Sequence, residues 1–192
     1  MMGKGKLFVI SGASGVGKSS VLSRVMASRD DLSFSVSATT RQPRPGEQDG
    51  VHYYFITKEQ FEMMIGEDAF LEYDNHAANY YGTPIAQLEQ RLCSGHVLLD
   101  IEPKGAEIVR GKRPDATLIF IMPPSEDVLE QRLRSRGDTS EEQIAMRLER
   151  AKWEMAQRNW YDYTVVNDDV DVCAKEVLEI IAQVADENNG GI

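Results

Sequence analysis

One short segment restricts the fold of this 192-residue chain more than any other. The run Gly12-Ala-Ser-Gly-Val-Gly-Lys-Ser19 fits the pattern G-x-x-x-x-G-K-[ST] at every fixed position. It follows an apolar run, 6–11, that predicts a buried strand, and precedes residues 19–27, whose apolar spacing is helical. The glycine-rich turn and the helix N-terminus both present free N–H groups to an anion. The segment therefore predicts a nucleoside triphosphate site.

Two side chains of this phosphate loop have distinct expected roles. Lys18 can reach the β- and γ-phosphates, and the Ser19 hydroxyl can ligate the Mg²⁺ that accompanies the nucleotide. The alternative, a glycine-rich turn with an exposed lysine, is disfavoured by the strand and the helix on either side. The candidate triphosphate-binding residues are Gly12, Ala13, Ser14, Gly15, Val16, Gly17, Lys18, Ser19 and Ser20.

The rest of the chain alternates between apolar runs and helical patterns. Further buried strands are expected at 96–101, 116–122 and 163–166. Helices are expected at 84–94, 104–111, 125–136, 140–158 and 170–187. This alternation predicts an α/β fold with a three-layer parallel-sheet core. The aromatic, turn-rich stretch 34–82 contains strand-like pieces, the first at Phe34–Ser37, and one helix, 58–67. We expect it to form an inserted β-rich lobe.

The charge balance limits the possible partners. The chain has 31 Asp and Glu against 21 Lys and Arg, and its formal net charge is -10. This disfavours nucleic acid and anionic membranes, because both require a basic surface. The excess is concentrated in 59–75 and 161–192, and most of the candidate site lies elsewhere. Two distant cysteines, no signal peptide and no membrane-spanning run lead us to expect a cytoplasmic protein with reduced thiols.

A second set of residues indicates an anionic acceptor. Arg41 and Arg44 lie in a proline-stiffened loop, and Tyr53 follows them. Guanidinium and phenol groups are suitable donors to a phosphate monoester. Glu72 and Asp100 are candidates for recognition of a base, because a carboxylate can accept both the N1–H and N2–H₂ donors of guanine. Adenine would leave such a carboxylate unpaired, which is costly in a buried site.

Taken together, these motifs resemble those of guanylate kinases over about Leu7 to Ile181. The resemblance implies a CORE, a GMP-binding lobe and a mobile LID, and the reaction ATP + GMP ⇌ ADP + GDP. The matching segments are 11–20, 35–47, 79–82, 99–102, 123–125, 132–137 and 166–169. The second and third of these are specific to the family, whereas the first occurs in many nucleotide enzymes. The implied division is 1–33, 84–125 and 159–192 for the CORE, 34–83 for the GMP-binding lobe, and 126–158 for the LID with its adjoining helix.

The resemblance also assigns roles residue by residue. The phosphate of GMP is expected to contact Arg41, Arg44, Tyr53 and Tyr81, and its guanine Ser37, Glu72, Thr83 and Asp100. The expected catalytic residues are Lys18, Arg41 and the LID arginines Arg132, Arg136 and Arg147. Asn167 is expected near the adenine of ATP. Taken alone, the LID arginines could equally be exposed helix residues, and Lys104 and Arg134 receive no role.

Two alternative functions stay open at this point. One is a non-catalytic guanylate-kinase-like module that binds phosphopeptides, which the complete Gly17-Lys18-Ser19 run disfavours. The other is a related small-molecule kinase of the same fold, against which Glu72, Tyr81 and Thr83 together favour a guanine nucleotide. The expected partners are ATP and GMP, with Mg²⁺ as the metal. The sequence does not fix the oligomeric state.

Overall fold

The strand that precedes the phosphate loop occupies the centre of the main sheet. In the computed structural model, which describes residues 5–76, 78–135 and 140–186, a five-stranded parallel sheet has the order β2-β7-β1-β8-β9. The two neighbours of β1 hydrogen-bond along both of its edges. The strands of this core sheet are β1 (Leu7–Gly12), β2 (Leu32–Phe34), β7 (His96–Asp100), β8 (Thr117–Met122) and β9 (Tyr163–Val166). The predicted α/β parallel-sheet core is confirmed.

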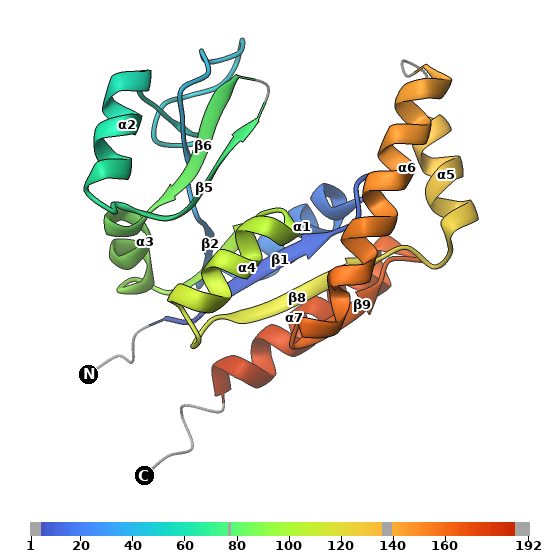
Figure 1. Cartoon of the computed structure of the whole chain (residues 1–192). Coiled ribbons are helices and arrows are strands. Elements are labelled where there is room, and N and C mark those ends of the chain that lie inside the picture. The colour runs from blue at the N-terminus through green and yellow to red at the C-terminus, as the bar shows by residue number, and fades with distance from the viewer. Residues whose placement is uncertain (1–4, 77, 136–139, 187–192) are drawn as a thin grey trace.

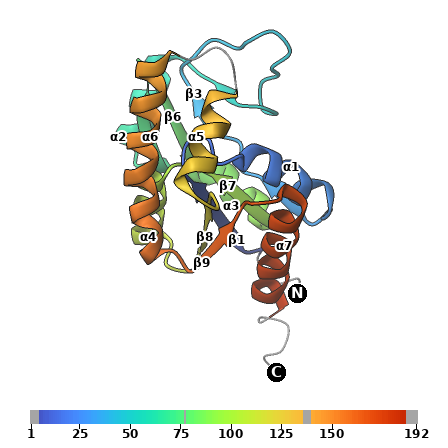
Figure 2. The ribbon, with the colours of Figure 1, turned by 90° about the vertical axis from the view of Figure 1, so that its right-hand side faces the viewer.

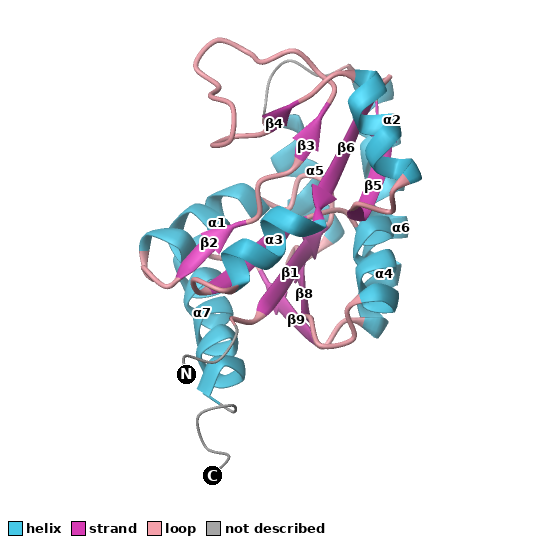
Figure 3. Cartoon of the chain, turned by 90° about the vertical axis from the view of Figure 1, so that its left-hand side faces the viewer, coloured by secondary structure: helices cyan, strands magenta, loops and turns pink. Residues whose placement is uncertain are grey.

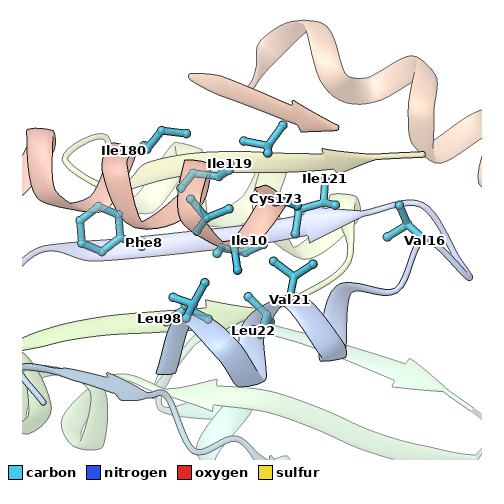
Figure 4. Close-up of a cluster of buried hydrophobic side chains, with 14 of the residues drawn as sticks. Phe8, Ile10, Val16, Val21, Leu22, Leu98, Ile119, Ile121, Cys173 and Ile180 are labelled. Atoms are coloured by element: carbon cyan, nitrogen blue, oxygen red, sulfur yellow. The ribbon is translucent and has the colours of Figure 1, made fainter. Parts of the chain in front are cut away.

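Helices cover both faces of the core sheet, as its continuous apolar strands predict. Alternate residues of β1 point to opposite faces, so Phe8 and Ile10 join one buried cluster while Leu7 and Val9 join another. Figure 4 shows the first cluster, in which the sheet packs against side chains of α1 and α7. The second cluster lies beneath α3 and α4. These helices are α1 (Lys18–Ala27), α3 (Ile85–Leu92), α4 (Pro103–Lys112) and α7 (Val170–Asp186).

A separate small lobe carries a second sheet. Its four strands have the order β4-β3-β6-β5, and Figure 3 shows them as a group apart from the core strands. Its helix begins with a capping box, in which Thr57 and Gln60 satisfy each other's backbone N–H groups. The elements of the lobe are β3 (Ala38–Thr39), β4 (Tyr54–Phe55), α2 (Lys58–Gly66), β5 (Phe70–His76) and β6 (Asn79–Pro84).

Two helices beyond β8 form the second excursion from the core. Helix α5 (Glu126–Arg134) packs against α6 (Glu141–Ala156), as Figure 2 shows, and a 3₁₀ helix, η1 (Gln157–Trp160), leads from α6 to β9. Figure 1 shows the lobe and the α5–α6 pair rising from the core sheet at opposite ends of the view. The lower part of α6 returns to the core, where Ala151 and Met155 join the buried cluster beneath α1 and α7.

The first strand expected in the lobe differs from the structure. The pattern at 34–37 predicts a lobe strand, but β2 ends at Phe34 and pairs in parallel with β7, so it is the edge strand of the core sheet. The alternation of small and apolar residues at Phe34–Ser37 is too short to distinguish the two sheets. The helix expected at 140–158 is also shorter, because its last residues tighten into η1.

The lobe depends on its own small core. Phe61 is fully buried and its ring stacks on Phe70, with a centroid separation of 4.2 Å, and on Tyr80, with a separation of 5.0 Å. This cluster shares no buried residue with the two clusters of the core sheet. The shape of the lobe therefore rests on a few aromatic contacts.

We predict that Phe61→Ala destabilises the protein by about 3–5 kcal/mol, because the substitution removes a buried ring and leaves a cavity. The free energy of unfolding is measured by urea titration. Met63→Ala on the same helix is the control, since that side chain is 59% exposed and its loss is expected to cost well under about 1 kcal/mol. Equal stability of the two variants would contradict the prediction.

Candidate functional site

The phosphate loop turns sharply where β1 ends. Gly15 and Gly17 have φ angles of +87° and +91°, which residues with a side chain rarely adopt. A Cβ at Gly15 would lie 2.5 Å from the Leu133 side chain, and one at Gly17 would lie 2.9 Å from Asn167 Nδ2. Helix α1 then begins at Lys18, so its N-terminal N–H groups open beside the loop. The sequence pattern thus reflects both backbone conformation and close packing.

A cavity of about 280 Å³ adjoins the loop. The Lys18 ammonium pairs with the Asp100 carboxylate and lies 3.4 Å from the Ile101 carbonyl oxygen. The cavity is lined by the loop residues Gly12–Ser19 together with Asp100, Glu102, Arg150 and Glu154. We refer to it as the donor cavity. It has the size and the N–H donors to hold phosphate groups.

Asn167 and Arg132 brace the outer side of the loop. The Asn167 amide donates to the Val16 carbonyl at 2.8 Å, and its Oδ1 is buried without a partner among the described residues. Arg132 donates to the carbonyl oxygens of Val16 at 3.1 Å, Asn167 at 2.9 Å and Asp168 at 3.1 Å. The Arg132 guanidinium therefore ties α5 and the end of β9 to the phosphate loop.

A second cavity, of about 240 Å³, lies between the lobe and the core. One of its charged lining residues, Glu72, is only 7% exposed and accepts a hydrogen bond from the Thr83 hydroxyl at 2.5 Å. Burial raises the pKa of the Glu72 carboxyl, and the nearby Asp74 adds to the shift. The cavity is lined by Ser37, Tyr53, Glu72, Asp74, His76, Tyr81, Gly82, Asp100, Ile101, Glu102, Lys104 and Gly105. We refer to it as the acceptor cavity.

The close approach of α4 fixes the Glu72 side chain. A Cβ built on Gly105 would lie 3.1 Å from Glu72 Oε2, which is tighter than ordinary contact. Glycine at this position therefore lets the helix pass directly behind the carboxylate.

Arginine and tyrosine side chains gather at one end of the lobe. Arg41 forms a bidentate pair with Glu47, at 2.8 and 2.9 Å, and its guanidinium lies 5.3 Å from the centre of the Tyr53 ring. The Tyr53 and Tyr81 rings are 6.0 Å apart. The Arg41 hydrogen bond and the Arg44 backbone N–H lower the pKa of Glu47 to about 2, so Glu47 is a carboxylate at neutral pH. This cluster can donate several hydrogen bonds to an anion.

The structure brings most of the expected site residues together. Ser37, Tyr53, Glu72, Tyr81 and Asp100 line one cavity, with Thr83 bonded to the buried carboxylate. Lys18 and the loop line the other, and Asp100 belongs to both. Neither Arg41 nor Arg44 is in the lining of the acceptor cavity: Arg41 lies over the ring of Tyr53, which is, and Arg44 is exposed. Arg147 is half-buried on α6, and Arg136 lies outside the described residues. The roles of all these residues stay predictions.

Several lining residues were assigned no role from the sequence. Lys104 and Gly105 lie in the first turn of α4, and their position just after the motif that contains Asp100 was a usable signal. Arg150 and Glu154 offered no signal of a place at the site, because Glu102 and Ser14, which they contact there, lie far away in the chain. Among the described residues, no group of three or more His, Cys, Asp or Glu side chains is arranged to hold a metal on its own. No described helix is long and apolar enough to cross a membrane.

Comparison with known proteins agrees with this geometry. A family model described as guanylate kinase matches residues 4–184. A guanylate kinase from Prochlorococcus marinus subsp. pastoris is 46% identical over 177 residues, which cover 92% of this chain and 96% of that protein. One from Thermus thermophilus is 48% identical over 179 residues, covering 93% and 81%. The crystal structure of guanylate kinase from Anaplasma phagocytophilum superposes with a TM-score of 0.73 at 29% identity, covering 95% of this chain and 87% of that chain.

These matches extend over nearly the whole length of the chain, including both cavities and the helices between them. They confirm the resemblance inferred from the motifs. The chain belongs to the guanylate kinase family.

Proposed function

We propose that the chain transfers the γ-phosphoryl group of ATP to GMP, giving ADP and GDP, with Mg²⁺ accompanying the ATP. The observation that carries this proposal is the junction of the two cavities: Asp100 and Glu102, at the end of β7 and just beyond it, line both of them. A triphosphate on the loop and a nucleotide in the acceptor cavity would therefore meet at this edge of the sheet. Ligands of open α/β sheets bind at the carboxyl ends of the strands in this manner.

The donor cavity suits a Mg²⁺-bound triphosphate. Loop N–H groups and Lys18 would bind the β- and γ-phosphates, and Asn167 would lie beside the adenine. The Ser19 hydroxyl and the Asp100 and Glu102 carboxylates are hard oxygen donors of the kind that Mg²⁺ prefers. Bound there, the ion would neutralise charge on the phosphate oxygens.

The acceptor cavity suits GMP. The Glu72 carboxylate would accept the N1–H and N2–H₂ groups of guanine, with Ser37, Thr83 and Asp100 as the further polar partners of the base. Arg41, Arg44, Tyr53 and Tyr81 would bind its phosphate, which would compete with Glu47 for the Arg41 guanidinium. The nucleophile is already an anionic phosphate oxygen, so the transfer needs no general base.

Catalysis would then consist of positioning and charge neutralisation. We propose that the lobe, 34–83, and the LID segment, 126–158, close on the CORE formed by 1–33, 84–125 and 159–192. Closure would exclude water and thereby suppress hydrolysis of ATP. It would also bring Arg132, Arg136 and Arg147 toward the transferred group. Before any such closure, Arg132 is already anchored to backbone carbonyls at the loop.

The proposal predicts a strong preference for GMP. In an assay coupled to ADP formation, GMP is expected to react at least about 100-fold more efficiently than AMP, UMP or dTMP, because only guanine presents two adjacent donors to Glu72: adenine has an acceptor at N1, and uracil and thymine offer a single N3–H. Lys18→Ala is expected to lower kcat on the order of 100-fold or more while the thermal unfolding temperature is retained. Equal rates with AMP and GMP would refute the assignment of the base.

The close approach of Gly105 to the Glu72 carboxylate gives a second prediction. Gly105→Ala is expected to raise the KM for GMP about tenfold, because the new methyl group displaces the Glu72 carboxylate, which is proposed to bind the guanine base. The KM for ATP is expected to stay within about twofold. Gly111→Ala is the control, since it lies in the same helix and a Cβ there would have nothing within 4 Å. A uniform effect of both alanines on GMP would contradict this explanation.

The raised pKa of Glu72 predicts a pH dependence of GMP binding. Only the ionised carboxylate accepts both guanine donors, so affinity is expected to fall as the pH is lowered through that raised pKa, above the ordinary value of 4.5. Calorimetry from pH 4.5 to 8 measures the dissociation constant. The GMP phosphate also titrates, and Glu72→Gln retains only that component. Parallel pH profiles for the wild type and Glu72→Gln would contradict the prediction.

A further inference from the structure

Two side chains of α6 connect to the donor cavity through a chain of charged contacts. Glu154 Oε2 accepts the backbone N–H of Ser14, in the phosphate loop, at 2.7 Å. Glu154 Oε1 accepts from Arg150 Nε at 3.0 Å, one turn earlier on the same helix. The other side of the Arg150 guanidinium lies 2.5 Å from Glu102, which precedes α4. The contacts thus join α6 to the phosphate loop and to the edge of the acceptor cavity.

The position of Glu154 is electrostatically unfavourable for a site that binds phosphates. The residue is only 2% exposed, yet its carboxylate lines the donor cavity together with Lys18 and Ser19. Burial, with the Glu154 charge as a smaller contribution, raises the pKa of the neighbouring Tyr161 to about 12. A negative charge held at this place, out of reach of solvent screening, would repel the incoming triphosphate.

Arg150 is placed to offset that charge. Lys18 and Arg150 are the two cationic residues in the lining of the donor cavity, and Lys18 is paired with Asp100. The side chain of Arg150 is 42% exposed, and it pairs with Glu154, the one buried carboxylate among the described residues of that lining. Glu102 and Asp100 are both substantially exposed, so water and salt screen their charges.

We propose that Glu154 and Arg150 are a positioning pair for the donor phosphates. Glu154 holds the Ser14 amide and so fixes the first turn of the loop, while Arg150 neutralises Glu154 so that a triphosphate can enter. This inference rests on the proposed function, because it takes the donor cavity to be the ATP site. It assigns neither residue a contact with the reacting atoms.

The proposal predicts a non-additive double-mutant cycle for ATP binding. Arg150→Leu is expected to weaken ATP affinity about tenfold, because it leaves the Glu154 charge uncompensated beside the phosphates. Arg150→Lys retains the positive charge and is expected to stay within about threefold of the wild type. Glu154→Gln keeps an oxygen for the Ser14 N–H but removes the charge. In the Arg150→Leu/Glu154→Gln protein, the affinity is expected to return to within about threefold of the wild type.

Calorimetric titration with Mg²⁺-ATP measures the affinity of each variant, and coupled kinetics give the KM for GMP, which is expected to stay unchanged. Lys175→Leu and Glu179→Gln are matched controls, since they form an exposed pair with the same four-residue spacing on α7. Glu154→Met, which removes the acceptor for the Ser14 N–H as well, is expected to lower kcat about tenfold, whereas Glu154→Gln is not.

Two results would overturn the proposal. One is an unchanged ATP affinity in Arg150→Leu. The other is a double variant as weak as Arg150→Leu alone, which would mean that Arg150 binds the phosphates directly. If Arg150→Leu does not fold, the double variant, which leaves no buried charge uncompensated, is compared with the wild type instead. An ATP affinity within about threefold of the wild type supports the proposal, and an affinity about tenfold weaker overturns it. Failure of the proposed function is a separate result: the wild type would bind ATP without transferring phosphate to GMP.

Discussion

The pairing of β1 with β7 determines where the chemistry can occur. Ile10 lies opposite Asp100 in that register, so β1 runs into the phosphate loop beside the acidic end of its neighbour. Both strands are buried on both faces, and a one-residue shift in register would move every apolar side chain to the wrong cluster. The hydrophobic core thereby fixes the distance between Lys18 and Asp100, and with it the place where the two cavities meet.

Carboxylates partner many of the cations around the two cavities. Lys18 pairs with Asp100, Arg41 with Glu47, and Arg150 with Glu102 and Glu154. Such pairs hold flexible cationic side chains near the positions where phosphates would bind, and they limit the repulsion among the cations. They also explain how an acidic chain, with a net charge of -10, can contain sites for two anionic nucleotides. The local arrangement of charges, rather than their sum, determines binding at such short range.

The sequence predicted those parts of the fold that depend on contiguous residues. Long apolar runs predicted β1, β7, β8 and β9, and the glycine pattern predicted the loop and the start of α1. The edge strand β2 was misplaced, because three residues carry too little pattern to distinguish one sheet from another. The Ser14–Glu154 contact could not have been predicted, since it joins residues 140 positions apart and depends on how α6 returns to the core. Motif resemblance supplied the candidate residues, and only the structure shows their distances and burial.

Strand β5 has a further consequence for how a nucleotide would be captured. Phe70 belongs to the aromatic core of the lobe, but Leu71 is packed into the core-sheet cluster beneath α3 and α4, and Glu72 follows directly. Arg41, in contrast, lies on the long connection between β3 and β4. The two parts of the proposed GMP site therefore differ in how they are held: the base would meet a wall that packs against the core-sheet cluster, and the phosphate would meet a long loop.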